Sequence, residues 1–281
     1  MQAEEQYLSL IDRIIKEGEL KHNRTGVDTL AIAGAMIEHD MSEGFPLLTT
    51  KKIGIKSVSA ELEFFIKGLK DKQWLKDRKC QIWNEWCNPD KVAYGNNVST
   101  KEQMANENDL GSIYGVIWRG KSEYQKVDQL QNIVNTLKSN PNDRRMVCSA
   151  WSPMDAPTQA LVPCHFAWQV TVINNKLNLF WSQRSVDVGL GLPYNIASYS
   201  LLLKLLAKET GLLEGKLIGF LADTHIYVNH LPQLKEQLNR KPFKLPQLNI
   251  TNFKSIFDWQ YTDIELLDYN HYTPLKMEVA V

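Results

Sequence analysis

The sequence predicts an α+β protein built around one large, mostly buried sheet. Helical apolar patterns interleave loosely with runs of aromatic and β-branched residues, without a strict strand–helix–strand alternation. A two-residue turn signal joins the two best strand candidates. With 281 residues, 43% of them hydrophobic and 23% charged, the chain is long enough to bury its own core. This length permits one large domain or two small ones.

Four helices are predicted from apolar residues at helical spacing, and they cover residues 4–19, 58–68, 128–140 and 193–211. In the first, Leu8, Ile11, Ile14 and Ile15 share one face. The third repeats this pattern with Leu130, Ile133, Val134 and Leu137. Gly68 and Gly211 supply plausible stops. Residues 88–109 are polar and rich in Asn, which predicts a surface loop or insertion.

Residues 165–173 and 176–185 are predicted to form a hairpin closed by Asn174 and Asn175. A two-residue turn there places Cys164 opposite Ser185 and His165 opposite Arg184. This register can slip by one or two residues.

Composition excludes several classes of protein. The 32 basic residues balance the 32 acidic ones, so the basic surplus of a typical nucleic-acid binder is missing. The four cysteines are too few for a disulfide scaffold and lack zinc-ligand spacing. Neither a signal peptide nor a transmembrane segment is evident. We expect a soluble, reduced protein of the cytoplasm.

Cys164 is the strongest candidate nucleophile. Its neighbour His165 should point to the opposite face of a strand, which argues against a Cys–His hydrolase. The hairpin instead brings Arg184 close, and a guanidinium beside a thiol favours the thiolate. The alternative is that Cys164 is a small buried hydrophobe.

Other side chains could serve the same chemistry. Arg24, Arg144, Arg145 and Arg184 suit phosphate recognition, although each alone could be a solvated surface residue. Glu61 lies within an apolar helical run, where burial would raise its pKa and allow it to move protons near neutrality. It could equally face solvent, as we expect for Glu63.

A metal site is not expected. His225 and His230 are five residues apart, a spacing that suits a shared metal neither on a strand nor on a helix. The run GLGLP after residue 188 is not a dinucleotide fingerprint.

Nine segments follow one another along the chain: RTGVDTLAIAG, GFPLLTTKK, IWNEW, DLGSIYGVIWR, NDRRMVCSAWSP, ALVPCH, SQRSVDVGLGLPYNIASY, DTHIYVNH and KMEVAV. Together they resemble the thymidylate synthase family. They run from Arg24 to Val281, nearly the whole chain. The resemblance implies a single catalytic domain over residues 1–281, with a large mixed sheet, flanking helices and a homodimer formed through that sheet. It implies methylation of deoxyuridine monophosphate (dUMP) to thymidylate (dTMP), with 5,10-methylenetetrahydrofolate as co-substrate and no metal.

The resemblance also implies roles for the matching residues. Cys164 would add to C6 of the pyrimidine, and Glu61 would organise protons around O4 and the folate, with Tyr114 and His165 in support. The nucleotide would be bound by Arg24, Gln183, Arg184, Ser185, Asn195, His225 and Tyr227, of which Arg184 and Asn195 also take part in catalysis. Arg144 and Arg145 would reach into the partner's phosphate site. The folate would be bound by Lys51, Trp83, Trp86, Asp187, Gly191 and Val281.

Several positions depart from the family pattern. Glu63 and Phe64 replace Leu-Trp, and Ser182, Tyr194 and Ala222 replace tyrosine, phenylalanine and glycine. Some of these flank the folate side, so a second reading is a dUMP hydroxymethylase, in which water instead of hydride reaches the exocyclic carbon. Asn195 favours uracil over cytosine in either reading. An RNA-binding or structural descendant of the fold is a third reading, which the neutral charge and the presence of Cys164 disfavour.

Overall fold

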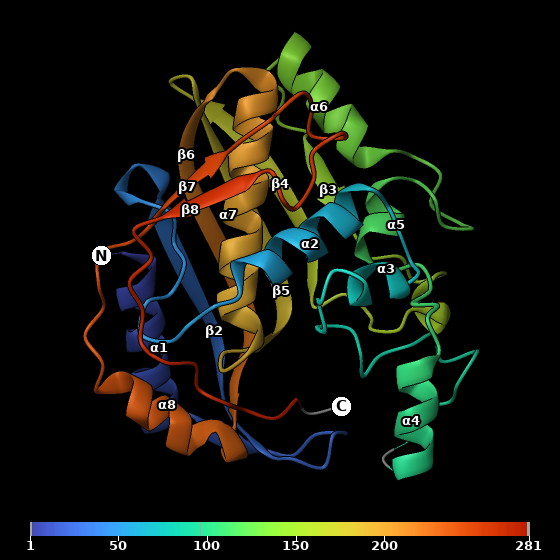
Figure 1. Ribbon diagram of the computed structural model, residues 1–281, viewed down its shortest axis with the longest axis vertical. Coiled ribbons are helices and arrows are strands. Elements are labelled where there is room, and N and C mark those ends of the chain that lie inside the picture. Colours follow the sequence, from blue (N-terminus) through green and yellow to red (C-terminus); the bar gives the residue numbers. More distant parts are fainter. Residues whose placement is uncertain (1, 96, 280–281) are drawn as a thin grey trace.

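The computed structural model describes residues 2–95 and 97–279, and its centre is a six-stranded mixed sheet (Figure 1). The strand order is β1-β2-β6-β5-β4-β3, in which β5 and β6 are parallel and all other neighbours antiparallel. The strands are β1 (Glu19–Lys21), β2 (Thr29–Asp40), β3 (Val147–Ser149), β4 (His165–Ile173), β5 (Lys176–Asp187) and β6 (Leu213–Tyr227). A separate two-stranded ribbon pairs β7 (Gln247–Ile250) with β8 (Ile264–Leu267). The predicted α+β class with one large sheet is confirmed.

The four predicted helices are confirmed with shifted ends. They are α1 (Ala3–Glu17), α2 (Ile55–Ile66), α6 (Gln129–Ser139) and α7 (Gly191–Thr210). The buried face of α6 is the predicted one. On α1 the fully buried residues include Tyr7 and Leu10, while Leu8 and Ile15 are only partly buried, so the buried face lies to one side of the predicted one. Short helices escaped prediction because they have too few turns to show a period: α3 (Gln73–Lys76), α4 (Val98–Asn106), α5 (Tyr114–Trp118) and α8 (Leu231–Leu238).

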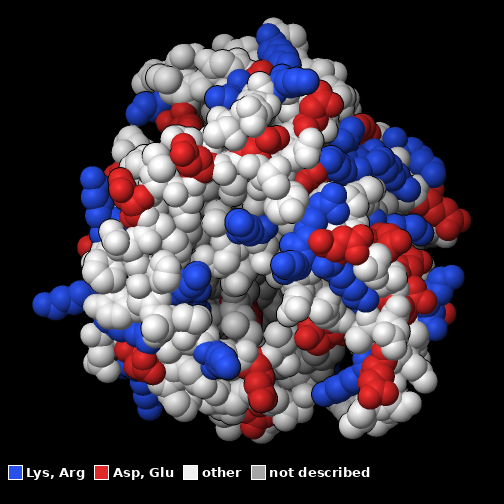
Figure 2. Space-filling view, viewed as in Figure 1, with Lys and Arg blue, Asp and Glu red and all other residues white. Residues whose placement is uncertain are grey.

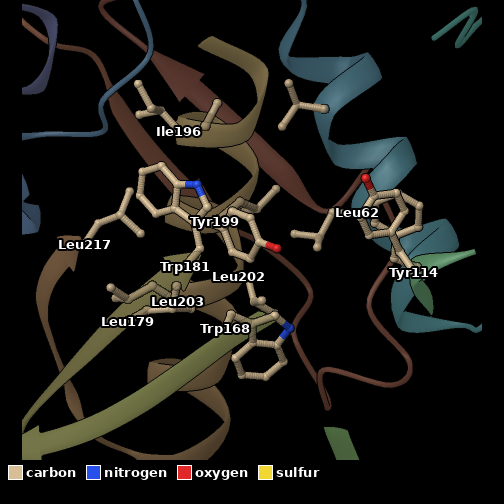
Figure 3. Close-up of a cluster of buried hydrophobic side chains, with 14 of the residues drawn as sticks. Leu62, Tyr114, Trp168, Leu179, Trp181, Ile196, Tyr199, Leu202, Leu203 and Leu217 are labelled. Carbon is tan, nitrogen blue, oxygen red and sulfur yellow. The ribbon is translucent and has the colours of Figure 1, made fainter. Parts of the chain in front are cut away.

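The longest helix, α7, lies across the sheet in Figure 1, with α2 beside it. Figure 3 shows the core between them and the strands. Trp181 of β5 stacks on Tyr199 of α7 with ring centroids 5.6 Å apart, and Trp168 of β4 meets Trp118 edge-on. Aromatic pairs of this kind contribute beyond the area they bury. This packing fixes where the first turn of α7 sits relative to the ends of β5 and β6.

Residues 88–109, predicted as a surface loop, include helix α4. Most of this segment is exposed or half-buried, but Met104 is buried. Within the described part of the chain, no helix is both long and apolar enough to span a membrane.

Candidate active site

The carboxyl ends of the parallel strands β5 and β6 open into a cavity of about 510 Å³. Side chains also reach it from α2, from the first turns of α5 and α7, and from the chain before β4. One face of the molecule is visibly hollowed in Figure 2, with Lys and Arg side chains around the opening. Ligands commonly bind at the carboxyl ends of parallel strands, so this cavity is the candidate active site.

Cys164 lines the cavity directly before β4. Its backbone N–H donates to the Tyr114 hydroxyl (2.9 Å), and its carbonyl accepts from the N–H of Arg184 (2.8 Å). The predicted register is confirmed from residue 167 to the turn, where Asn174 and Asn175 both have positive φ. It fails at the last pair, because an irregularity between residues 165 and 167 shifts the partner of His165 to Gln183. Bulges of this kind re-aim side chains next to active sites.

Two arginines lie near the Cys164 thiol and oppose the effect of its burial. The guanidinium of Arg184 donates from Nε to the carbonyl of Pro163 (2.9 Å) and from Nη2 to that of Val162 (2.7 Å). Burial raises the pKa of the Cys164 thiol, while Arg184 and Arg24 lower it. The predicted influence of Arg184 is present, but burial outweighs it.

Glu61 of α2 faces the cavity and is 8% exposed. Its Oε1 accepts from Trp83 Nε1 at 2.7 Å. Burial raises the pKa of Glu61 to about 7, although the hydrogen bond from Trp83 opposes the rise. Of the two readings that the sequence left open, the buried carboxyl is the observed one. The expectation for Glu63 was wrong: that side chain is 1% exposed and pairs with Lys67.

His165 points into a stack of aromatic rings, and in the part of the chain that the structure describes its ring has no hydrogen bond to the Cys164 thiol. Its ring lies 4.1 Å from that of Tyr114, nearly parallel, and Nδ1 is 2.8 Å from the Tyr199 hydroxyl. Burial lowers the pKa of His165 to about 3, so its imidazole is neutral. Tyr114 thereby links the histidine ring to the backbone of Cys164.

The carboxyl ends of β5 and β6 contribute polar side chains to the cavity lining. Gln183 donates to the carbonyl of Ser185 (3.0 Å), and Asp187 accepts from the N–H groups of Gly189 and Leu190 at the start of α7. On β6, His225 Nδ1 lies 3.1 Å from Asp223. Further predicted residues on the cavity wall are Arg24, Trp86, Gly191, Asn195 and Tyr227.

Nearly the whole chain matches one family. The family profile described as thymidylate synthase matches residues 5–281. The thymidylate synthase of Mycoplasma mobile is 42% identical over 290 residues, covering 99% of this chain and 100% of the relative. That of Mycoplasma pneumoniae is 42% identical over 289 residues with the same coverage, and that of Corynebacterium aurimucosum 39% over 277, covering 98% and 97%. This chain belongs to the thymidylate synthase family.

Three described residues that the family resemblance assigned to the site do not line the cavity. Arg144 and Arg145 are exposed, and Arg145 pairs with Asp143. Lys51 is 4% exposed, donates to the carbonyl of Gly189, and has its pKa lowered by burial to about 8. Val281 lies outside the described residues.

The cavity also contains residues that the sequence reasoning did not assign. Ile82, Leu161 and Leu190 are apolar parts of the cavity wall. Tyr194 also lines the cavity, and the sequence had marked it only as a departure from the thymidylate synthase pattern. Apolar side chains carry no chemical signature in a sequence, so only the fold could find them. Tyr194 offered a weak signal in the sequence, because it directly precedes the predicted site residue Asn195 in α7.

Proposed function

We propose that this protein methylates dUMP to dTMP, with 5,10-methylenetetrahydrofolate as the source of the carbon. The observation that carries the proposal is that one cavity is lined by Cys164, by two arginines and by the buried Glu61. Full-length similarity to thymidylate synthases supports the same conclusion.

The nucleotide would bind with its phosphate at Arg24 and Arg184. Guanidinium groups bind phosphate oxygens in a forked geometry, and both arginines already influence the Cys164 thiol. The phosphate end and the reacting carbon would therefore be fixed by adjacent groups. Asn195, in the first turns of α7, would offer its amide to the uracil edge. His225 and Tyr227 also line the cavity, and they would hold the sugar.

Cys164 would form a bond from its sulfur to C6 of uracil, which leaves electron density on C5 and O4. The thiol proton must leave before this step, since the thiolate is the nucleophile. Glu61, with a pKa of about 7, can both donate and accept a proton near neutrality. The neutral His165 and the Tyr114 hydroxyl orient the polypeptide at Cys164 without adding charge.

The second substrate would bind against the apolar part of the cavity lining. Ile82, Trp83, Trp86, Leu190 and Tyr194 form a largely apolar wall that suits a flat pterin ring. Asp187 adds a carboxylate to the cavity lining. When bound there, methylenetetrahydrofolate supplies the one-carbon unit and the hydride. With the folate bound, this wall would exclude water, which would favour hydride over water at the new carbon.

The sheet offers a surface for a homodimer. Its strands expose apolar side chains, including Met36 (58% exposed) and Phe220 (46%), and Phe220 stacks on Phe180. Exposed apolar patches mark interaction surfaces. A symmetric dimer through this face would let Arg144 and Arg145, both exposed and before β3, serve the partner's phosphate site.

The decisive test is the mass of the nucleotide product formed from dUMP and methylenetetrahydrofolate. Hydride transfer adds about 14 Da and releases dihydrofolate, whereas addition of water adds about 30 Da without it. The first result is expected. The second would reassign the protein as a hydroxymethylase, and an unchanged nucleotide would overturn the proposal.

Substituting Cys164→Ser tests the nucleophile. Because a serine hydroxyl is far less acidic than a thiol, turnover should fall by at least about three orders of magnitude. Binding of dUMP, measured by calorimetry, should remain within a few fold of the wild type. Near wild-type turnover would exclude Cys164 as the nucleophile.

A further inference from the structure

Lys72, just before α3, is a lysine whose side chain is completely buried. Its Nζ donates to three backbone carbonyls, those of Asn84 (3.1 Å), Trp86 (2.7 Å) and Met104 (2.8 Å). An ammonium has three N–H donors, so all of them are used. Burial and the neighbouring Lys76 lower the pKa of Lys72 to about 8, which leaves the ammonium the main form at neutral pH.

The three carbonyls belong to two separate parts of the chain. Those of Asn84 and Trp86 lie in the segment that carries the aromatic wall of the cavity, whereas Met104 lies in the last turn of α4. Carbonyls at the end of a helix have no partner within the helix. The single ammonium group of Lys72 therefore hydrogen-bonds both to the end of α4 and to the backbone of the cavity wall. Lys76 also binds this end of α4, at the carbonyl of Ala105, and the side chain of Asn108 just beyond it. Among the described residues, its ammonium has no hydrogen bond to the wall.

A second contact from the same region supports Trp86. The ring of Tyr94 lies 6.1 Å from that of Trp86. The single hydroxyl proton of Tyr94 is shared between two carbonyl oxygens, that of Cys87 at 3.0 Å and that of Ala160. The backbone on one side of Trp86 is thus held by Lys72 and that on the other by Tyr94. The segment 88–109 contributes to both supports, through α4 and Tyr94.

We propose that Lys72 is a positioning residue for the co-substrate side of the cavity, where its bonds to α4 and to the Trp86 backbone fix the indole wall. This inference rests on the proposed function, since the wall is assigned there to the folate. It gives the 88–109 segment a role within the active site. Trp86 lies three residues from Trp83, which donates to Glu61, so a displaced wall would also disturb the carboxyl that moves protons.

Lys72→Met and Lys76→Met form a matched pair for the test. Both remove an ammonium bound to the end of α4, but only the first removes a bond to the cavity wall. Three quantities are measured: calorimetric affinity for dUMP, affinity for tetrahydrofolate with dUMP present, and amide hydrogen exchange of residues 82–88. Steady-state KM and kcat with both substrates complete the comparison.

Lys72→Met should weaken tetrahydrofolate binding by about tenfold. Without the hydrogen bonds from Lys72, the Trp86 backbone is no longer fixed, and the indole wall loses part of its contact with the folate. Affinity for dUMP should stay within about twofold, and exchange of residues 82–88 should accelerate. The KM for the folate should rise more than kcat falls. Lys76→Met should leave every value within about twofold of the wild type.

Unchanged folate affinity and exchange in Lys72→Met would overturn the inference, as would equal effects of the two variants. If Lys72→Met does not fold, Tyr94→Phe tests the support of Trp86 instead, because it removes only a hydroxyl. This variant should weaken folate binding about threefold. Unchanged folate binding would count against the proposal that these contacts hold the indole wall. Failure of the proposed function looks different: the wild type would not convert dUMP, while exchange at residues 82–88 would still report whether Lys72 orders the wall.

Discussion

Replacing Glu61 by glutamine should make the protein more stable at alkaline pH. Burial raises the pKa of this carboxyl from 4.5 to about 7. The folded protein therefore binds the proton more tightly than the unfolded chain, and the free energy of unfolding falls as the pH rises between these values. One pKa unit corresponds to about 1.4 kcal/mol. Ionised Glu61 thus costs the folded state about 3 kcal/mol above pH 7.

Glutamine has the same shape, keeps an oxygen that can accept from Trp83 Nε1, and does not ionise. The stability of Glu61→Gln relative to the wild type should increase by about 2.5 kcal/mol between pH 5 and pH 8. Urea unfolding of both proteins at each pH unit measures this difference, and other titrating groups cancel in it. Turnover should fall in the same variant, because glutamine cannot move the proton.

Glu63→Gln is the control, two residues further along the same helix. Glu63 is also buried, but its Oε2 accepts from the N–H of Tyr261 (2.7 Å) and its Oε1 pairs with Lys67. Its substitution should destabilise the protein, because Lys67 loses its partner. A stability difference for Glu61→Gln that stays flat from pH 5 to pH 8 would refute the reasoning.

Two further predictions concern packing and assembly. Gly115→Ala should lower the free energy of unfolding by at least about 2 kcal/mol, since a Cβ there would lie 2.2 Å from the carbonyl oxygen of Phe65; an unchanged urea midpoint would contradict that close approach. Arg145→Ala should leave the melting temperature unchanged, because the side chain is exposed, yet raise the KM for dUMP if the arginine serves a partner's site. An unchanged KM would count against that part of the dimer proposal.

Local patterns predicted much of the fold. The four longer helices and the β4–β5 hairpin depend on residues close in sequence, so periodicity and the Asn-Asn turn were sufficient. The irregularity next to His165 was not predictable from these patterns, because it inserts one residue without a glycine or proline to mark it. Because of this extra residue, the backbone N–H that donates to the carbonyl of Cys164 is that of Arg184 and not that of Ser185.

Helix α2 shows a different limit of periodicity. An amphipathic pattern assumes one buried and one exposed face, and on that assumption Glu63 was expected in solvent. From residue 58 to the last residue, Ile66, every position of α2 is buried, because α5, α7 and the chain near Tyr261 surround it. A helix covered on all sides can contain two buried glutamates with different environments. Only their partners distinguish Glu61, the proposed proton carrier, from Glu63, which forms an ion pair.

The protonation states of the site depend on the same long-range packing. Arg184 could be placed near Cys164 from the hairpin alone, which gave the correct sign for its effect on the thiol pKa. Desolvation comes from the whole cavity wall, assembled from α2, α5, α7 and two strands, and it raises the pKa of Cys164 and Glu61 while lowering that of His165. The family motifs therefore identified most of the polar groups that meet in the cavity, whereas the charge that each group carries there follows from the fold.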